Sequence, residues 1–193
     1  MMKRIQYNAP VTLTFALVSL GALLLSRVDG GWANTHLFSV YRCAWGDLLA
    51  LPRIFLHVLG HANYSHYLNN MLLILALGQG LEDKYGSRSL LLCILITAFV
   101  TGVAQMLLFP GTAVLGASGI AFMMIVFSSM AGMREGKIPL TTLVILVIYL
   151  GGEVLNGLFR KDNISQLSHI LGGLCGGEFG FLLPISSICV SPF

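Results

Sequence analysis

Ser118 is the residue of this chain whose surroundings most favour chemistry. It lies in the stretch VLGASGIAF, between Gly116 and Gly119. Small residues at this density let two backbones approach closely, so the stretch predicts a helix-packing face, and the same face can leave a serine hydroxyl open to a reactant. A serine becomes a nucleophile when a base lies within hydrogen-bond distance of its hydroxyl. The other apolar segments must supply that base.

Three polar residues in other apolar segments fit the requirement. His66 and Asn70 in SHYLNN are four residues apart and share one face of a helix. His169 precedes GGLCGG, whose overlapping GxxxG patterns predict close helix packing. Such packing against the Ser118 helix would bring His169 to the hydroxyl as a base, with His66 and Asn70 as donors to an oxyanion. No carboxylate lies at the same depth to orient His169, so the expected machinery is a dyad.

Each of these residues also has a purely structural interpretation. Ser118 can bond to the backbone of its own helix, and His169 can be an interfacial side chain. Asn70 can be a hydrogen-bonding contact between helices, and the glycines can serve packing alone. The two interpretations are compatible, because close helix packing is what the dyad requires.

The composition indicates that lipid surrounds most of the chain. Of its 193 residues, 56% are hydrophobic and only 10% are charged, whereas a soluble domain carries about 25% charged residues. A net charge of +3 is too small and scattered for a nucleic-acid surface, so membrane lipids are expected partners and nucleic acid is not. The four cysteines form no CxxC pair and predict no disulfide framework.

The elements that must position these residues are six apolar spans, each near the ~20 residues that cross a bilayer. They cover residues 11–26, 64–81, 89–108, 116–133, 139–158 and 168–187. The predicted fold is an all-α polytopic membrane protein with six transmembrane helices in one domain, residues 1–193. The long first loop, 27–63, is apolar with interleaved aromatics, which is typical of short helices in the membrane interface.

The orientation follows from the charges and the span count. The N-terminus resembles a signal peptide, but no A-x-A-type site follows, so it is interpreted as a retained first helix. A slight excess of Lys and Arg on one side predicts a cytoplasmic N-terminus. The second, fourth and sixth spans then run inward from the outside, which puts His66, Asn70, Ser118 and His169 together in the outer half.

Three motifs give the chain a resemblance to a known family. They are HYLNNM (HxxxN), GASGI (GxSG) and SHILGGLCG (an AHxxGxxxG-like pattern), on the second, fourth and sixth spans. In this order they resemble the rhomboid family of intramembrane serine proteases, of the small bacterial GlpG type, over about residues 50 to 180. The stretch GLEDKYGS, which contains Glu82, is also similar to that type.

The resemblance implies a function for each motif. Ser118 would be the nucleophile and His169 the general base, and the oxyanion hole would consist of His66, Asn70 and the backbone N–H of Ser118. Substrates would be transmembrane segments of other proteins, cut near the outer face of the bacterial inner (plasma) membrane. No metal and no other cofactor is implied. The fifth span, after Pro139, is the expected gate for substrate entry.

The chain departs from the family pattern at three places. Phe122 stands where members often have a tyrosine against the catalytic histidine, so the ring is kept and the hydroxyl is lost. Ser168 replaces the usual alanine before that histidine, a change between small residues. Pro52-Arg53 stands where relatives carry Trp-Arg, so no role of that tryptophan transfers to this chain.

Three other functions remain open from the residues alone. HVLGH spaces His57 and His61 as metal ligands, with His66 as a third, but the glutamate of HExxH is missing. Glu153 and Glu178 are carboxylates within spans, as in a transporter or channel, although no internal repeat supports that function. A non-catalytic relative that binds membrane proteins is the third alternative.

Overall fold

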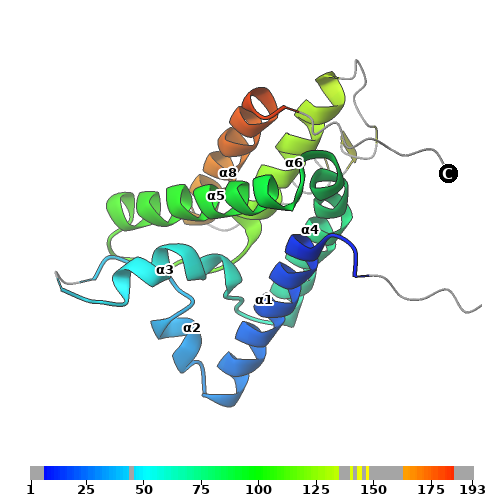
Figure 1. The fold of residues 1–193 in the computed structure, drawn as a ribbon. Helices are drawn as coiled ribbons and strands as arrows, with labels where there is room; N and C mark the ends of the chain where they lie inside the picture. Colours follow the sequence, from blue (N-terminus) through cyan, green and yellow to red (C-terminus); the bar gives the residue numbers. More distant parts are fainter. Residues whose placement is uncertain are drawn as a thin grey trace, which may run out of the picture.

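The chain folds into long helices joined by turns and by a folded first loop (Figure 1). The computed structural model describes residues 7–43, 46–134, 140, 143–144, 147 and 163–184. The long helices are α1 (Pro10–Val28), α4 (Tyr64–Tyr85), α5 (Ser87–Leu108), α6 (Ser118–Arg134) and α8 (Asn163–Leu182). The first loop contains α2 (Trp32–His36), α3 (Ala50–Leu56) and the 3₁₀ turn η1 (His57–Leu59).

The long helices lie over the predicted spans, with several boundaries shifted. Helices α1, α4 and α5 cover the first three spans, and α6 covers the fourth except residues 116 and 117. Helix α8 begins at Asn163 rather than at 168, because its polar first turn is helical although it is not apolar. His169 therefore lies inside the helix and does not open it. The fifth span, 139–158, and the gate expected there lie almost entirely outside the described residues.

Two of the described helices are long and apolar enough to cross a membrane on length and composition. They are α1 and α5. Helix α4 has a suitable length, with 22 residues, but polar and charged side chains lower its mean hydropathy. Those polar side chains include His66 and Asn70, so the helix that departs most from a plain apolar span is one of those expected to hold the site.

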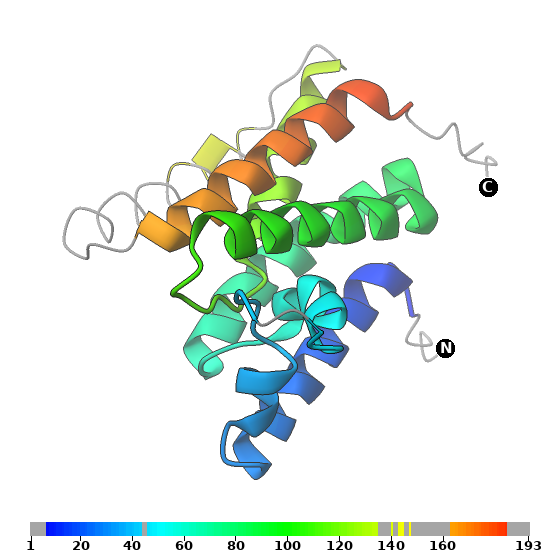
Figure 2. The same ribbon diagram turned by 90° about the vertical axis from the view of Figure 1, so that its left-hand side faces the viewer.

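The helices are arranged so that α6 lies between α4 and α8 (Figures 1 and 2). Helix α5 crosses this group, α3 runs beside α5, and α1 packs along α4. The largest fully buried apolar side chains come from four long helices and the first loop, and most of them lie on α6: Leu23, Val40, Ile74, Leu90, Ile120, Met123, Met124, Ile125 and Phe127. Helix α6 is thus the central element, and Ser118 is its first residue.

Glu82 fixes the start of α1 against the end of α4. Its carboxylate accepts hydrogen bonds from the backbone N–H groups of Val11 (2.9 Å) and Thr12 (3.0 Å) and from the Thr12 hydroxyl (2.8 Å). The first N–H groups of a helix have no partner within it, and a negative charge there interacts favourably with the helix dipole. A carboxylate on α4 therefore replaces a capping residue that α1 lacks.

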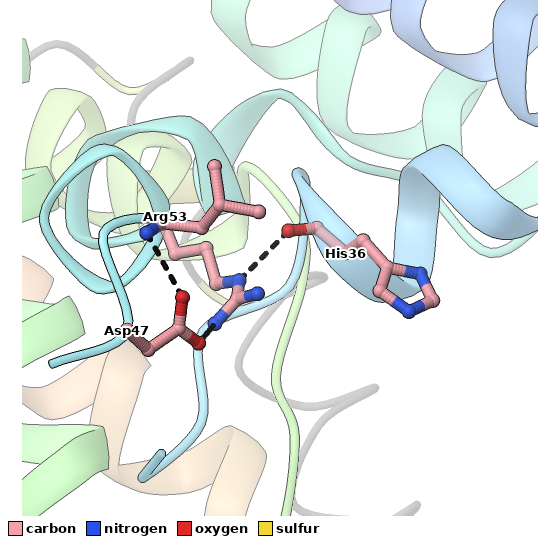
Figure 3. Close-up of polar contacts among 4 residues, drawn as sticks. His36, Asp47 and Arg53 are labelled. Atoms are coloured by element: carbon pink, nitrogen blue, oxygen red, sulfur yellow. Dashed lines mark hydrogen bonds and ion pairs between the residues drawn. The ribbon is translucent and has the colours of Figure 1, made fainter. Parts of the chain in front are cut away.

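Arg53 organises the first loop (Figure 3). Its side chain is almost completely buried and forms an ion pair with Asp47 at 2.6 Å. Its Nε donates to the carbonyl of His36 at 2.7 Å, and its guanidinium lies 4.6 Å from the centre of the Tyr41 ring. Asp47 in turn accepts from the N–H of Leu49. Hydrogen bonding to Arg53 lowers the pKa of Asp47 below its usual value.

Candidate active site

The segment that leads to Ser118 is held by the first loop. Val114 pairs with Val40 in an antiparallel bridge through N–H···O bonds of 2.9 and 3.0 Å. The N–H of Gly116 donates to the carbonyl of His57 at 2.9 Å. Gly116 has φ of 132°, a conformation that side-chain-bearing residues rarely adopt, so the turn before Ser118 favours glycine. Ser118 is half-buried at the start of α6, where N–H groups lack helical partners.

Helices α6 and α8 meet backbone to backbone. A Cβ added to Gly172 would overlap the carbonyl oxygen of Gly119 and lie 2.9 Å from its carbonyl carbon. A Cβ on Gly176 would meet the Met123 carbonyl in the same way, 3.0 Å from its carbon. The first of the two GxxxG pairs seen in the sequence therefore lines the contact with α6.

The second GxxxG pair lies to the side of this contact. A Cβ on Gly173 would lie 3.6 Å from a methyl carbon of Val126, and one on Gly177 would lie 4.0 Å from the other. Both are ordinary van der Waals distances. Of these two pairs, only Gly172 and Gly176 require the absence of a side chain, so Gly173 and Gly177 offer a matched control on the same helix.

His169 lies next to the first turn of α6. Its ring stacks on Phe122, with 4.3 Å between ring centroids and 13° between planes, and its side chain is buried. Phe122 follows Ser118 by four residues, so the two share one face of α6. A Cβ on Gly119 would lie 3.3 Å from the Ser168 carbonyl oxygen. Ser118 and His169 therefore come from turns of α6 and α8 that contact each other.

His66 reaches the same place from α4. A Cβ on Gly116 would lie 2.8 Å from Cε1 and 2.9 Å from Nε2 of His66, so the edge of the imidazole faces the turn before Ser118. Asn63 caps α4 by accepting from the N–H of His66 at 2.8 Å. Asn70, one turn further along α4, is completely buried. The His66 ring of α4 thus lies against the turn that precedes α6.

His57 and His61 are buried parts of the first loop. The Nδ1 of His57 bonds to the Ile54 carbonyl at 2.9 Å, and its Nε2 lies 3.3 Å from the Thr101 hydroxyl. The Nδ1 of His61 bonds to the Leu59 carbonyl at 3.1 Å. In the parts of the chain that the structure describes, no three His, Cys, Asp or Glu side chains are grouped as metal ligands.

His61 lies closer to the expected site than the sequence indicated. Its ring centroid is 5.1 Å from that of His66, at an interplanar angle of 67°, and 5.4 Å from the ring of Tyr67. The sequence suggested His61 only as a metal ligand, through its spacing from His57. Burial, together with the nearby His66, lowers the pKa of His61 to about 4, so its ring is neutral at neutral pH.

Of the two carboxylates that suggested transport, Glu178 is not part of this group. Glu178 is exposed on α8 and follows Gly172 and Gly176, whereas His169 precedes them. Glu153 lies outside the described residues.

Comparison with known proteins gives a consistent assignment. A family model described as the Rhomboid domain matches residues 49–185. The rhomboid protease GluP of Bacillus subtilis is 30% identical over 182 residues, which is 89% of this chain and 34% of that protein. The rhomboid protease GlpG of Pectobacterium atrosepticum is 26% identical over 175 residues, 89% of this chain and 62% of that protein. The chain thus spans about a third and about three fifths of the lengths of these relatives.

Proposed function

Because the chain belongs to the Rhomboid family and is an integral membrane protein, we propose that it is an intramembrane serine endopeptidase. In this proposal Ser118 is the nucleophile and His169 the general base of a dyad. The main support is the position of His169 on Phe122, one turn from Ser118 on the same face of α6, across the Gly119–Gly172 contact. A base within hydrogen-bond distance of a serine activates its hydroxyl, and the proposal gives His169 that role.

The proposed reaction proceeds in two halves. The Oγ of Ser118 attacks the carbonyl carbon of the substrate peptide bond while its proton passes to His169. His169 then gives that proton to the leaving amine, and an acyl-enzyme on Ser118 remains. A water molecule that gives a proton to His169 hydrolyses this ester and restores the serine. No metal enters any of these steps.

The negative oxygen of the tetrahedral intermediate requires fixed donors. We assign these to the N–H of Ser118, the ring N–H of His66 and the side-chain amide of Asn70. The support for this assignment is that α6 begins at Ser118 and that the His66 edge lies against Gly116 in the preceding turn. Donors at a helix start act on an oxyanion without rearranging, and each contributes about 10²–10³ in rate.

The expected substrates are transmembrane segments of other proteins. Such a segment is helical, so its peptide bonds are bonded within the helix and it must unwind before Ser118 can attack. Glycine or proline near the cut would ease that unwinding. We further propose that the N-terminus is cytoplasmic and that the site opens toward the outer face of a bacterial inner membrane. In this proposal residues 139–158 form the fifth of six spans and gate substrate entry.

A serine-reactive fluorophosphonate probe tests the proposal. The purified wild-type chain should be labelled and should cut a single-span substrate in proteoliposomes. Ser118→Ala should abolish labelling and lower the cleavage rate by ~10⁴–10⁶. Ser128→Ala, on the same helix, is the matched control and should keep both. Labelling that persists in Ser118→Ala, or cleavage above a few per cent of wild type, would contradict the assignment.

A further inference from the structure

His61 carries an unused hydrogen-bond acceptor next to the proposed oxyanion donor. Its side chain is completely buried, and its Nε2 has no hydrogen-bond partner among the described residues. A buried polar atom without a partner is costly and is rare in folded proteins. The burial of the His61 Nε2 atom therefore indicates a role beyond the packing of the first loop.

The protonation state of the His61 ring follows from its other nitrogen. Nδ1 lies 3.1 Å from the Leu59 carbonyl oxygen, which can only accept, so Nδ1 carries the ring proton. The ring is neutral because burial lowers its pKa to about 4. Nε2 of His61 is consequently a lone-pair acceptor, and the group that satisfies it must be a donor.

His66 presents a matching requirement. To donate to an oxyanion, its Nε2, which faces Gly116, must carry the proton. In a neutral imidazole Nδ1 is then a second acceptor. Two acceptors cannot bond to each other, but one water molecule has two hydrogens to give. The His61 and His66 rings meet edge to face, with 5.1 Å between their centroids. A single water at the margin of this contact, hydrogen-bonded to both rings, would satisfy both acceptors.

We propose that His61 is a positioning residue for His66. A water molecule donates one hydrogen to Nε2 of His61 and the other to Nδ1 of His66. This bridge keeps the His66 proton on Nε2 and fixes the ring edge toward Ser118. His61 touches no substrate and acts only through His66. The inference rests on the proposed function, because it requires His66 to be an oxyanion donor.

The first test is a double-mutant cycle on cleavage of a single-span substrate. His61→Phe keeps a ring at this position and removes the acceptor, and should lower kcat about tenfold with KM within about twofold. His61→Gln places an amide oxygen near the position of Nε2 and should recover most of that loss. In a His66→Ala background, His61→Phe should change kcat by less than about twofold. His36→Phe, a ring replacement elsewhere in the loop, is the control and should match wild type.

The second test does not depend on activity. In protein with ¹⁵N-labelled histidine rings, wild-type His66 should show the Nε2–H tautomer, and His61→Phe should show a mixture of tautomers. Full additivity of the His61 and His66 losses, or an unchanged His66 tautomer in folded His61→Phe, would overturn the inference. Failure of the proposed function is a separate result: it appears as cleavage or probe labelling that persists in Ser118→Ala.

Discussion

The ring of Phe122 lies parallel to the imidazole of His169, with 4.3 Å between their centroids. This stack fixes the orientation of the His169 ring. The glycine contact between α6 and α8 fixes the distance of His169 from the first turn of α6. A proton acceptor must have both its distance and its direction set before it can serve a nucleophile. The relation between these two residues leads directly to the first prediction.

Phe122→Leu should lower the cleavage rate by about 2–10-fold. An aromatic pair is worth about 0.5–1.5 kcal/mol beyond its buried area, and the loss falls on the orientation of His169. Phe122→Tyr keeps the ring and should retain activity close to wild type. Steady-state kinetics on one substrate compares the two variants. Equal rates for Phe122→Leu and wild type would show that the stack does not orient the histidine.

Gly172→Ala should disrupt the site, whereas Gly173→Ala should not. The added methyl of Gly172→Ala overlaps the backbone of Gly119, so α6 and α8 must separate, and overpacking of this kind costs about 1–3 kcal/mol. The methyl of Gly173→Ala meets Val126 at an ordinary distance. The thermal unfolding temperature and the cleavage rate should both fall for Gly172→Ala only. Similar values for the two alanines would contradict the backbone contact.

Glu82→Gln should loosen α1 from α4. The amide offers one acceptor oxygen where the carboxylate offers two, so a donor at the start of α1 loses its partner, at a cost of about 1–3 kcal/mol. Asp83→Asn, the exposed neighbour, is the control. The midpoint of unfolding by denaturing detergent should shift to a lower detergent fraction for Glu82→Gln and stay at the wild-type value for Asp83→Asn. A shift of equal size in both would point to a general charge effect.

The ion pair of Asp47 and Arg53 should make the first loop sensitive to acid. Bonding to Arg53 lowers the pKa of Asp47 in the folded chain below its unfolded value near 3.8. The stabilisation is therefore complete above that unfolded pKa and is lost as the pH falls through the lower folded pKa.

Hydrogen exchange of the loop amides measures this effect. Exchange in the wild type should accelerate on acidification from pH 5 to about 3, beyond the intrinsic dependence of exchange on pH. Asp47→Asn should show faster exchange already at pH 5 and little further change. A wild-type loop with no acceleration over this range would argue that Arg53 is held by His36 and Tyr41 alone.

The sequence predicted the parts of the fold that depend on local patterns. Apolar runs located α1, α4, α5 and α6, and the GxxxG pattern pointed to the Gly172 face of α8. The start of α8 was placed five residues late, because hydropathy marks the lipid core and not the end of a helix. The roles of Ser118, His66, Asn70 and His169 remain predictions that the experiments above test.

Other features depend on contacts between separate segments of the chain, which no local sequence pattern predicts. The pairing of Arg53 with the His36 carbonyl joins two segments of the first loop, and the His61 ring meets His66 only because the chain turns between them. Spacing alone grouped His61 with His57, as in a metal motif, whereas the fold turns the two rings to different neighbours. Tertiary contacts of this kind require coordinates.

The order of the helices along the chain has a consequence for biosynthesis. The close contact of Gly119 with Gly172 forms only when α8, the last described helix, has been made and inserted, although α6 is completed well before it. A chain emerges from the ribosome N-terminus first, at about 5–20 residues per second. During the seconds between the two helices, a nascent chain holds Ser118 without His169. Under the proposed function, the nascent chain is therefore inactive while it is being inserted into the membrane. The protease becomes active only when α8 packs against α6.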